Sequence, residues 1–87
     1  MTPVTRGEIR QVLRDNARLP VDPESLRDDA DLFQAGMSSH ASVNVMLALE
    51  DAFDVEFPDR MLKRSVFESI DGIAAALQEL EMEAKAG

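Results

Sequence analysis

The chain has 87 residues, which predicts one small domain near the lower size limit of a self-sufficient hydrophobic core, and its lack of cysteine excludes disulfides and a thiol nucleophile of its own. Its net charge of −8 at pH 7, from 17 acidic and 9 basic residues, disfavours nucleic-acid binding and favours partners with basic patches. No apolar run is long enough to span a membrane and the start "MTPVTRGEIRQ" lacks the apolar core of a signal peptide, so we expect a soluble, cytoplasmic monomer.

The first predicted element is a helix over residues 5–16. Thr5 and Glu8 have the spacing of a capping box, in which each side chain accepts a hydrogen bond from the other residue's backbone N–H. Apolar residues then recur at helical spacing: Ile9, Val12 and Leu13. Arginines at i, i+4 spacing form a stripe that we interpret as a solvated face: Arg6, Arg10 and Arg14.

Residues 17–37 are predicted to form a long, ordered loop. Pro20, Pro23 and a cluster of aspartates forbid a long helix there. Five apolar residues are expected to pin the loop to the core: Leu19, Val21, Leu26, Leu32 and Phe33. The aspartates lack the alternating spacing and central glycine of a calcium-binding loop, so we interpret them as a solvated acidic surface and predict no metal site.

Three further helices are predicted over residues 39–53, 59–63 and 69–83, the second of them a short turn after Pro58. The first carries one buried stripe: Ser42, Val45, Met46, Leu49 and Phe53. The last carries another: Ile70, Ile73, Ala74, Leu77 and Leu80. Val43 and Leu47 lie off the stripe of the helix over 39–53 and are expected to be partly exposed. No strand is predicted.

The stretch "AGMSSHASV" lies where the acidic loop ends and the helix over residues 39–53 begins. Ser38 is suited to be the N-cap, accepting from the N–H of Ala41 or of a neighbouring residue, which leaves Ser39 with its hydroxyl turned outward. Neighbours on a helix do not face each other, so His40 is not a candidate base for Ser39. Gly36-Met37-Ser38 also lacks the following glycine and preceding strand of a nucleophile elbow, so we predict no enzyme activity.

The longer stretch "DADLFQAGMSSHASVNVMLALEDAFDVEFPD" resembles the acyl and peptidyl carrier protein family. The resemblance implies an all-α, acyl-carrier-protein-like four-helix bundle. It also implies that Ser39 carries 4′-phosphopantetheine, a group transferred from coenzyme A by a phosphopantetheinyl transferase. Two positions depart from the family pattern, since Ser38 replaces the usual Asp and His40 replaces the usual Leu.

Within that family the stretch is most similar to small stand-alone aminoacyl carrier proteins, which are loaded by seryl-tRNA-synthetase-like amino acid:carrier protein ligases. This resemblance implies such a ligase and a downstream acceptor enzyme as partners, and a small amino acid as a cargo that stays outside the helical core on a solvent-facing arm. Five residues are candidates for partner docking: Met37, His40, Val43, Asn44 and Leu47. The carrier domain is expected to occupy residues 1–87, with its core over about 4–82 and a flexible tail over 83–87.

Two alternatives from the same residues stay open. One is a helical adaptor that binds protein through Val43 and Leu47 without covalent modification; the other is a carrier of fatty acyl or polyketide intermediates.

Overall fold

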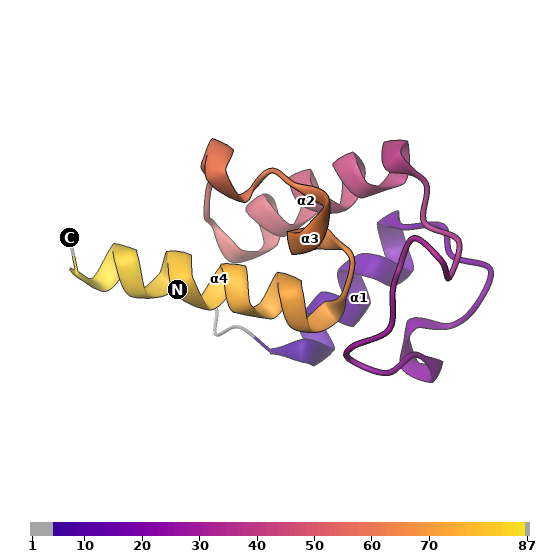
Figure 1. Ribbon diagram of the computed structural model, residues 1–87. Coiled ribbons are helices and arrows are strands. Elements are labelled where there is room, and N and C mark those ends of the chain that lie inside the picture. The colour runs from indigo at the N-terminus through magenta and orange to yellow at the C-terminus, as the bar shows by residue number, and fades with distance from the viewer. Residues whose placement is uncertain (1–4, 87) are drawn as a thin grey trace.

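The computed structural model describes residues 5–86, with side chains described up to Glu83. The elements, in chain order, are α1 (Arg6–Asn16), η1 (Pro23–Ser25), α2 (Ser39–Phe53), η2 (Asp59–Met61), α3 (Arg64–Phe67) and α4 (Ile70–Ala86), where η marks a 3-10 turn. Figure 1 shows these elements along the chain, and residues 5–86 contain no strand. The all-α fold with three main helices, one short helix and a long loop after the first helix is confirmed.

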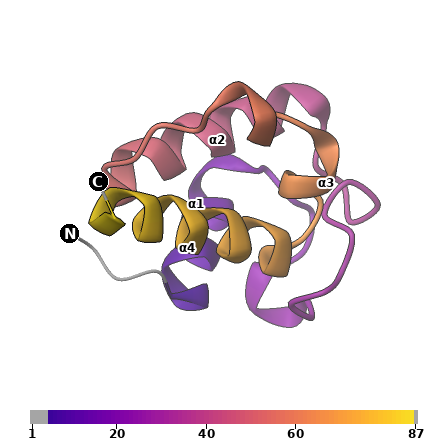
Figure 2. The same cartoon turned by 60° about the vertical axis from the view of Figure 1, so that its left-hand side comes forward.

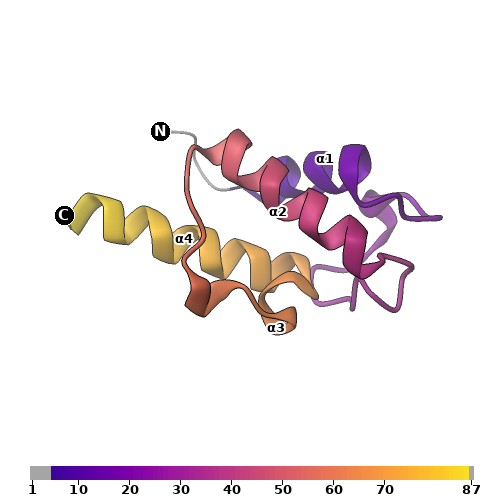
Figure 3. The same ribbon diagram turned by 90° about the horizontal axis from the view of Figure 1, so that it is seen from above.

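Helix α1 packs against both α2 and α4, and the short α3 packs on α4 (Figures 1 and 3). The buried apolar side chains come from all four helices and from the loop, and the fully buried ones are Ile9, Leu13, Leu32, Val45, Leu49, Ile70, Ile73 and Leu77. The core therefore joins segments distant in sequence. None of the helices described is long and apolar enough to cross a membrane.

Helix α1 begins at the predicted cap. The Thr5 hydroxyl accepts a hydrogen bond from the N–H of Glu8 at 3.1 Å. The return bond expected of a full capping box, from the Thr5 N–H to the Glu8 carboxylate, is not formed in the described part of the chain. The predicted helix is therefore confirmed, but only half of the capping box is present.

The loop between α1 and α2 is ordered and pinned to the core, as predicted, with one exception. Leu32 is fully buried, and Leu19, Leu26 and Phe33 pack partly buried against the core. Val21 is 43% exposed, so its predicted role as an anchor is wrong. Pro23, the first residue of η1, is buried instead.

The short third helix was predicted over residues 59–63, but the α-helical turn lies after that range, at Arg64–Phe67. Residues 59–63 form only the 3-10 turn η2, because Leu62 leaves helical geometry with φ −87° and ψ 68°, and its side chain is 46% exposed. The α-helical turn is α3, which buries Phe67 edge-on to Phe57 with ring centroids 5.3 Å apart. Four residues are too few for hydrophobic periodicity to reveal.

Helix α4 is longer than predicted. It begins at Ile70, where the Ser69 hydroxyl accepts from the N–H of Gly72, and it continues to Ala86 rather than ending at residue 83. Its C-terminal half extends beyond the rest of the bundle (Figures 1 and 3). Gly87 lies outside the described residues, as does Val4 at the start of the expected core, so the domain limits and the flexible tail stay predictions.

Candidate functional site

The loop that leads into α2 is fixed by backbone hydrogen bonds. The Leu32 N–H donates to the Glu68 carbonyl at 2.6 Å, and the Met37 N–H donates to the Leu32 carbonyl at 3.0 Å. Between them Gly36 has φ +124°, a conformation that side-chain-bearing residues rarely adopt. A Cβ at this position would also lie 2.6 Å from Cδ of Pro20. A glycine is therefore required for the turn that delivers the chain to the start of α2.

The two serines at the start of α2 have different surroundings. Ser38 is the N-cap, with extended backbone geometry and a hydroxyl that accepts from the Ala41 N–H at 3.0 Å, as expected. Ser39 is the first residue of the helix and is exposed; its carbonyl accepts from the Ser42 hydroxyl. Within residues 5–83 the Ser39 hydroxyl forms no hydrogen bond. One serine thus builds the helix end and the other presents an unbonded hydroxyl to solvent.

His40 is exposed and makes no hydrogen bond to Ser38 or Ser39 in the described structure. Nothing in this geometry activates a serine for nucleophilic attack. The place of His40 among the docking candidates stays a prediction.

Beside Ser39 lies an open groove of about 520 Å³ between α2 and the segment around α3. Nine residues line it: Phe33, Ser39, Ser42, Val43, Met46, Leu62, Lys63, Arg64 and Phe67. The guanidinium of Arg64 lies over the Phe33 ring, 4.2 Å from its centroid. Met46 was predicted as core and is instead half-buried in this groove. Sequence reasoning missed the groove because three segments distant in sequence form it.

The candidate docking residues do not form one surface. Met37 is only 3% exposed, so its predicted role in docking is wrong; its side chain belongs to the core. Val43 and Leu47 are 51% and 53% exposed, as expected. Val43 lines the groove beside Ser39, whereas Asn44 and Leu47 line a separate hollow of about 390 Å³ with Arg18 and Asp51. The exposed surface of α2 is therefore divided between two separate hollows, one with Val43 and Ser39 and the other with Asn44 and Leu47.

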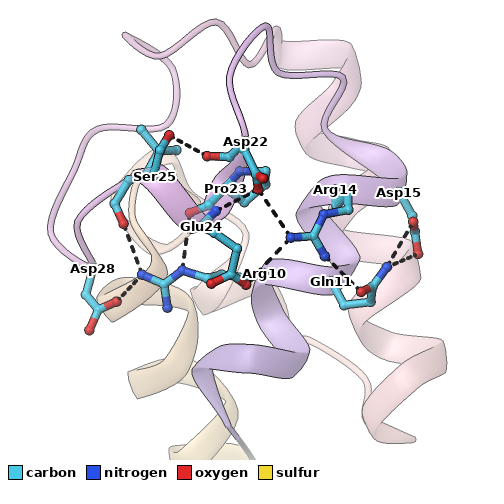
Figure 4. Close-up of polar contacts among 10 residues, drawn as sticks. Arg10, Gln11, Arg14, Asp15, Asp22, Pro23, Glu24, Ser25 and Asp28 are labelled. Carbon is cyan, nitrogen blue, oxygen red and sulfur yellow. Dashed lines mark hydrogen bonds and ion pairs between the residues drawn. The ribbon is translucent and has the colours of Figure 1, made fainter.

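The arginine stripe of α1 is the expected solvated face at Arg6 and Arg14, whose side chains are 46% and 41% exposed, but not at Arg10. Arg10 donates to the carbonyls of Pro23 and Leu26 and pairs with Asp28, and its side chain is only 15% exposed (Figure 4). The stripe also binds the acidic loop to α1 through these contacts. Spacing alone could not show this pairing, because the partners lie on an irregular segment.

Two neighbours of Arg10 extend this network. Arg14 pairs with Asp22 and Glu24 (Figure 4). Arg6 pairs with Asp28 and with Asp71 at the start of α4, and the Asp71 carboxylate raises the pKa of Arg6 further. The ion pairs thus join α1, the loop and α4, and they help to hold the segment that leads to Ser39.

Asp22 gives this network a predicted pH dependence. Its carboxylate accepts from the Glu24 N–H at 3.0 Å and pairs with Arg14, and these contacts lower its pKa. A carboxyl whose pKa is lower in the folded state stabilises the fold above its unfolded pKa of about 3.9, and this contribution is lost as the pH falls through the folded pKa. We therefore expect the stability difference between wild type and Asp22→Asn to be constant above about pH 5 and to shrink below about pH 4.

Urea unfolding of both proteins from neutral to acidic pH measures that difference. Glu24→Gln is the matched control, because the Glu24 carboxylate is also an acidic partner of Arg14, at 3.6 Å, but accepts no hydrogen bond within residues 5–83. A difference for Asp22→Asn that does not change with pH would contradict the assignment.

Comparison with known proteins identifies the class. Residues 7–77 match the family described as "PP-binding: Phosphopantetheine attachment site". This match covers most of the chain, and the chain belongs to this family of phosphopantetheine-bearing carrier proteins. Its part in chemistry is therefore that of a carrier, not a catalyst.

Individual members of the family and solved structures are also similar to this chain. The chain is 49% identical over 65 residues to the aminoacyl carrier protein of Agrobacterium fabrum (strain C58 / ATCC 33970), covering 75% of this chain and 78% of the relative. It is also similar to a chain in the crystal structure of engineered Bradyrhizobium japonicum glycine:[carrier protein] ligase complexed with carrier protein from Agrobacterium tumefaciens and AMP. The TM-score is 0.83 at 43% identity, with 85% of this chain and 99% of that chain covered.

A third likeness is to a solution structure from Agrobacterium tumefaciens, ATC2521. The TM-score is 0.75 at 40% identity, covering 95% of this chain and all of that one. The expected acyl-carrier-protein-like fold is thereby confirmed.

Proposed function

We propose that this carrier protein holds a small aminoacyl group on a 4′-phosphopantetheine arm attached to Ser39, and presents it to partner enzymes. The observation that carries the proposal is the exposed, unbonded Ser39 hydroxyl beside Ser38, whose own hydroxyl is used in capping α2. Ser38 is therefore needed for the helix, and Ser39 is available for a transferase.

The residues around Ser39 fit the arm. Within residues 5–83 the backbone N–H groups of Ser39 and His40 form no hydrogen bond. These groups and the positive end of the helix dipole suit the phosphodiester through which the arm is attached. The chain has no cysteine, and the arm supplies the thiol on which an aminoacyl group is held as a thioester. The chain itself contributes attachment, orientation and a surface for partners.

The cargo is inferred from the relatives and from the chemistry of burial. The aminoacyl carrier protein and the carrier protein complexed with a glycine ligase both support an aminoacyl cargo, with glycine or alanine expected. A fatty chain gains about 0.8 kcal/mol for each methylene buried, whereas an aminoacyl group has little to bury and an ammonium that is costly to desolvate. We therefore expect the cargo to stay outside the helical core.

The partners proposed are a phosphopantetheinyl transferase, an amino acid:carrier protein ligase and a downstream acceptor enzyme. The likeness to a carrier protein complexed with a ligase supports the second of these. Coenzyme A and ATP, which modification and loading consume, are cytoplasmic metabolites, and this supports the cytoplasm as the site of action.

The test is intact mass after incubation with coenzyme A and a broad-specificity phosphopantetheinyl transferase, with loading as the second step. The holo-protein is offered to an amino acid:carrier protein ligase with ATP and glycine or alanine, and in parallel to a fatty acyl ligase with an acid of eight to twelve carbons. We expect the phosphopantetheine mass increase and then aminoacylation only. An unmodified protein would favour the adaptor alternative. Efficient fatty loading with shifts in core residues would favour the fatty carrier.

Loading should depend only weakly on salt. Helix α2 carries no acidic or basic side chain from Ser39 to Leu49 other than His40, so docking on this face lacks the long-range attraction that salt screens. Glu50, at its far end, accepts from the Phe57 N–H at 2.8 Å, which leaves Asp51 and Asp54 as the exposed acids there. We expect kcat/KM of the ligase to fall less than about threefold between about 0.05 and 0.5 M salt.

Two variants check this prediction. Leu47→Ala should weaken loading because it removes exposed apolar surface. Asp51→Asn with Asp54→Asn should change loading little, and asparagine suits the left-handed geometry of Asp54 (φ +53°). A steep loss of loading with salt that this double variant does not reduce would count against apolar docking on α2.

A further inference from the structure

The basic residues of the described chain fall into two groups. Five arginines form ion pairs with carboxylates: Arg6, Arg10, Arg14, Arg27 and Arg60. Three basic side chains form none within residues 5–83: Arg18, Lys63 and Arg64. Carboxylates are abundant on a chain of net charge −8. Basic side chains that nevertheless pair with no carboxylate are therefore available to bind another anion. Lys63 and Arg64 are adjacent, and both line the groove that contains Ser39.

The position of Arg64 leaves its hydrogen-bond donors available. Its guanidinium lies over the face of Phe33, 4.2 Å from the ring centroid, which restrains the side chain through a cation–π contact. Arg64 donates no hydrogen bond and forms no ion pair within residues 5–83, so its N–H groups can still bind an oxyanion. Arginine does so with two parallel hydrogen bonds to phosphate, and lysine adds a compact point charge.

We propose that Lys63 and Arg64 form a phosphodiester-binding site, and that its occupant is the proximal end of the arm on Ser39 of the same molecule. This inference rests on the proposed function. Charge complementarity supports it, since the arm is joined to the protein by an anionic phosphodiester and these two cations line the groove in which Ser39 lies. The covalent tether also keeps the phosphate at a high local concentration.

The apolar lining of the groove suits the part of the arm next to the phosphate. Val43, Met46, Leu62 and Phe67 provide a surface for the aliphatic carbons at the phosphate end of pantetheine. The groove is open, so the distal thiol and its cargo remain in solvent. The expectation of a solvent-facing arm then holds for the distal end alone. Because exposed ion pairs are weak, a partner enzyme can release the arm at small cost.

The experiment compares apo- and holo-protein by NMR, with holo-protein first verified by mass. A nitroxide attached to the arm's thiol broadens the signals of the backbone amides that the end of the arm approaches. The ³¹P relaxation reports the mobility of the phosphodiester. In wild type we expect apo-to-holo amide shift changes at Phe33, Leu62 and Phe67 as well as at the start of α2. In Lys63→Gln/Arg64→Gln we expect the bound-to-released ratio of the arm to fall about threefold to fivefold, as for exposed ionic contacts.

The matched control is Arg18→Gln/Arg27→Gln, which removes the same charge away from the groove. It should leave the ³¹P relaxation and the groove shifts as in wild type. Raising the salt concentration should release the arm of the wild-type holo-protein. This measurement needs no substitution, so it tests the inference even if the double variant fails to fold.

Three outcomes would overturn the inference. The first is a holo-protein whose shift changes stop at the first turn of α2. The second is an equal effect of the two double variants on the ³¹P relaxation. The third is a double variant that loads poorly while its arm behaves as in wild type, because the cations would then serve a partner. If mass shows no modification at all, the proposed function fails and this inference with it, whereas the three outcomes above leave the proposed function intact.

Discussion

Ser39→Ala is expected to abolish phosphopantetheine attachment, because it removes the unbonded hydroxyl at the first residue of α2. Its effect on stability should be small, since the Ser39 hydroxyl forms no hydrogen bond within residues 5–83. Intact mass after incubation with coenzyme A and a transferase measures attachment, and urea unfolding measures stability. The variant should therefore be folded and unmodified.

Ser38→Ala is the matched control and should show the opposite result. It removes the hydrogen bond from the Ala41 N–H to the capping hydroxyl, which costs about 0.5 to 2 kcal/mol of stability. It should still be modified, although more slowly if the start of α2 frays. Modification that survives Ser39→Ala and is lost in Ser38→Ala would show that the attachment residue had been assigned one position too late.

Gly36→Ala is expected to be strongly destabilising. The backbone at Gly36 has φ +124°, and a Cβ there would lie 2.6 Å from Cδ and 3.1 Å from Cγ of Pro20. Backbone strain and overpacking together should lower the free energy of unfolding by about 2 to 4 kcal/mol. Because Gly36 precedes the cap of α2, the rate of modification at Ser39 should fall as well. Urea unfolding and the transferase rate measure the two effects.

Gly7→Ala is the control for this substitution. Apart from its chain neighbours and the backbone of its own helix, no atom of the described residues lies within 4 Å of a Cβ built at Gly7, which occupies an exposed position in α1. Alanine there should be neutral or stabilising by up to about 1 kcal/mol. Adding Pro20→Ala to Gly36→Ala should recover the steric part of the loss but not the part due to φ. Equal stabilities of Gly36→Ala and Gly7→Ala would contradict this account of the turn.

The three main helices could be predicted because the apolar spacing and the capping residues in their sequences agree with the side chains that are buried in the fold. The stripe of α2 predicted Val45, Leu49 and Phe53 as buried, and they are. The cap at Ser38 could be predicted for the same reason, since a capping side chain bonds to its own helix. Each of these predictions needed only residues within one element.

Features that depend on distant segments could not be predicted in this way. The arginine stripe of α1 has the spacing of a solvated face, yet Arg10 binds loop carbonyls and Asp28, and only the folded loop brings them within reach. The path of that loop around one end of the bundle is visible in Figure 2.

The surface beside Ser39 was missed for the same reason. Periodicity ranked Met46 with the core and gave no sign of Lys63 and Arg64, because the groove exists only once α2 and the segment around α3 are packed. Met37 was misjudged because its place next to the serines suggested a surface residue, whereas the turn at Gly36 directs it into the core.

The most direct test of the central claim is fragmentation mass spectrometry of the tryptic peptide 28–60 from holo-protein loaded with glycine. This peptide contains both serines of the site, begins after Arg27 and ends at Arg60. We predict that the fragments first carry the mass of glycyl-phosphopantetheine when they include Ser39, and that fragments ending at Ser38 are unmodified. A modification on Ser38, or a peptide with no added mass after incubation with coenzyme A, transferase, ligase, ATP and glycine, would contradict the account.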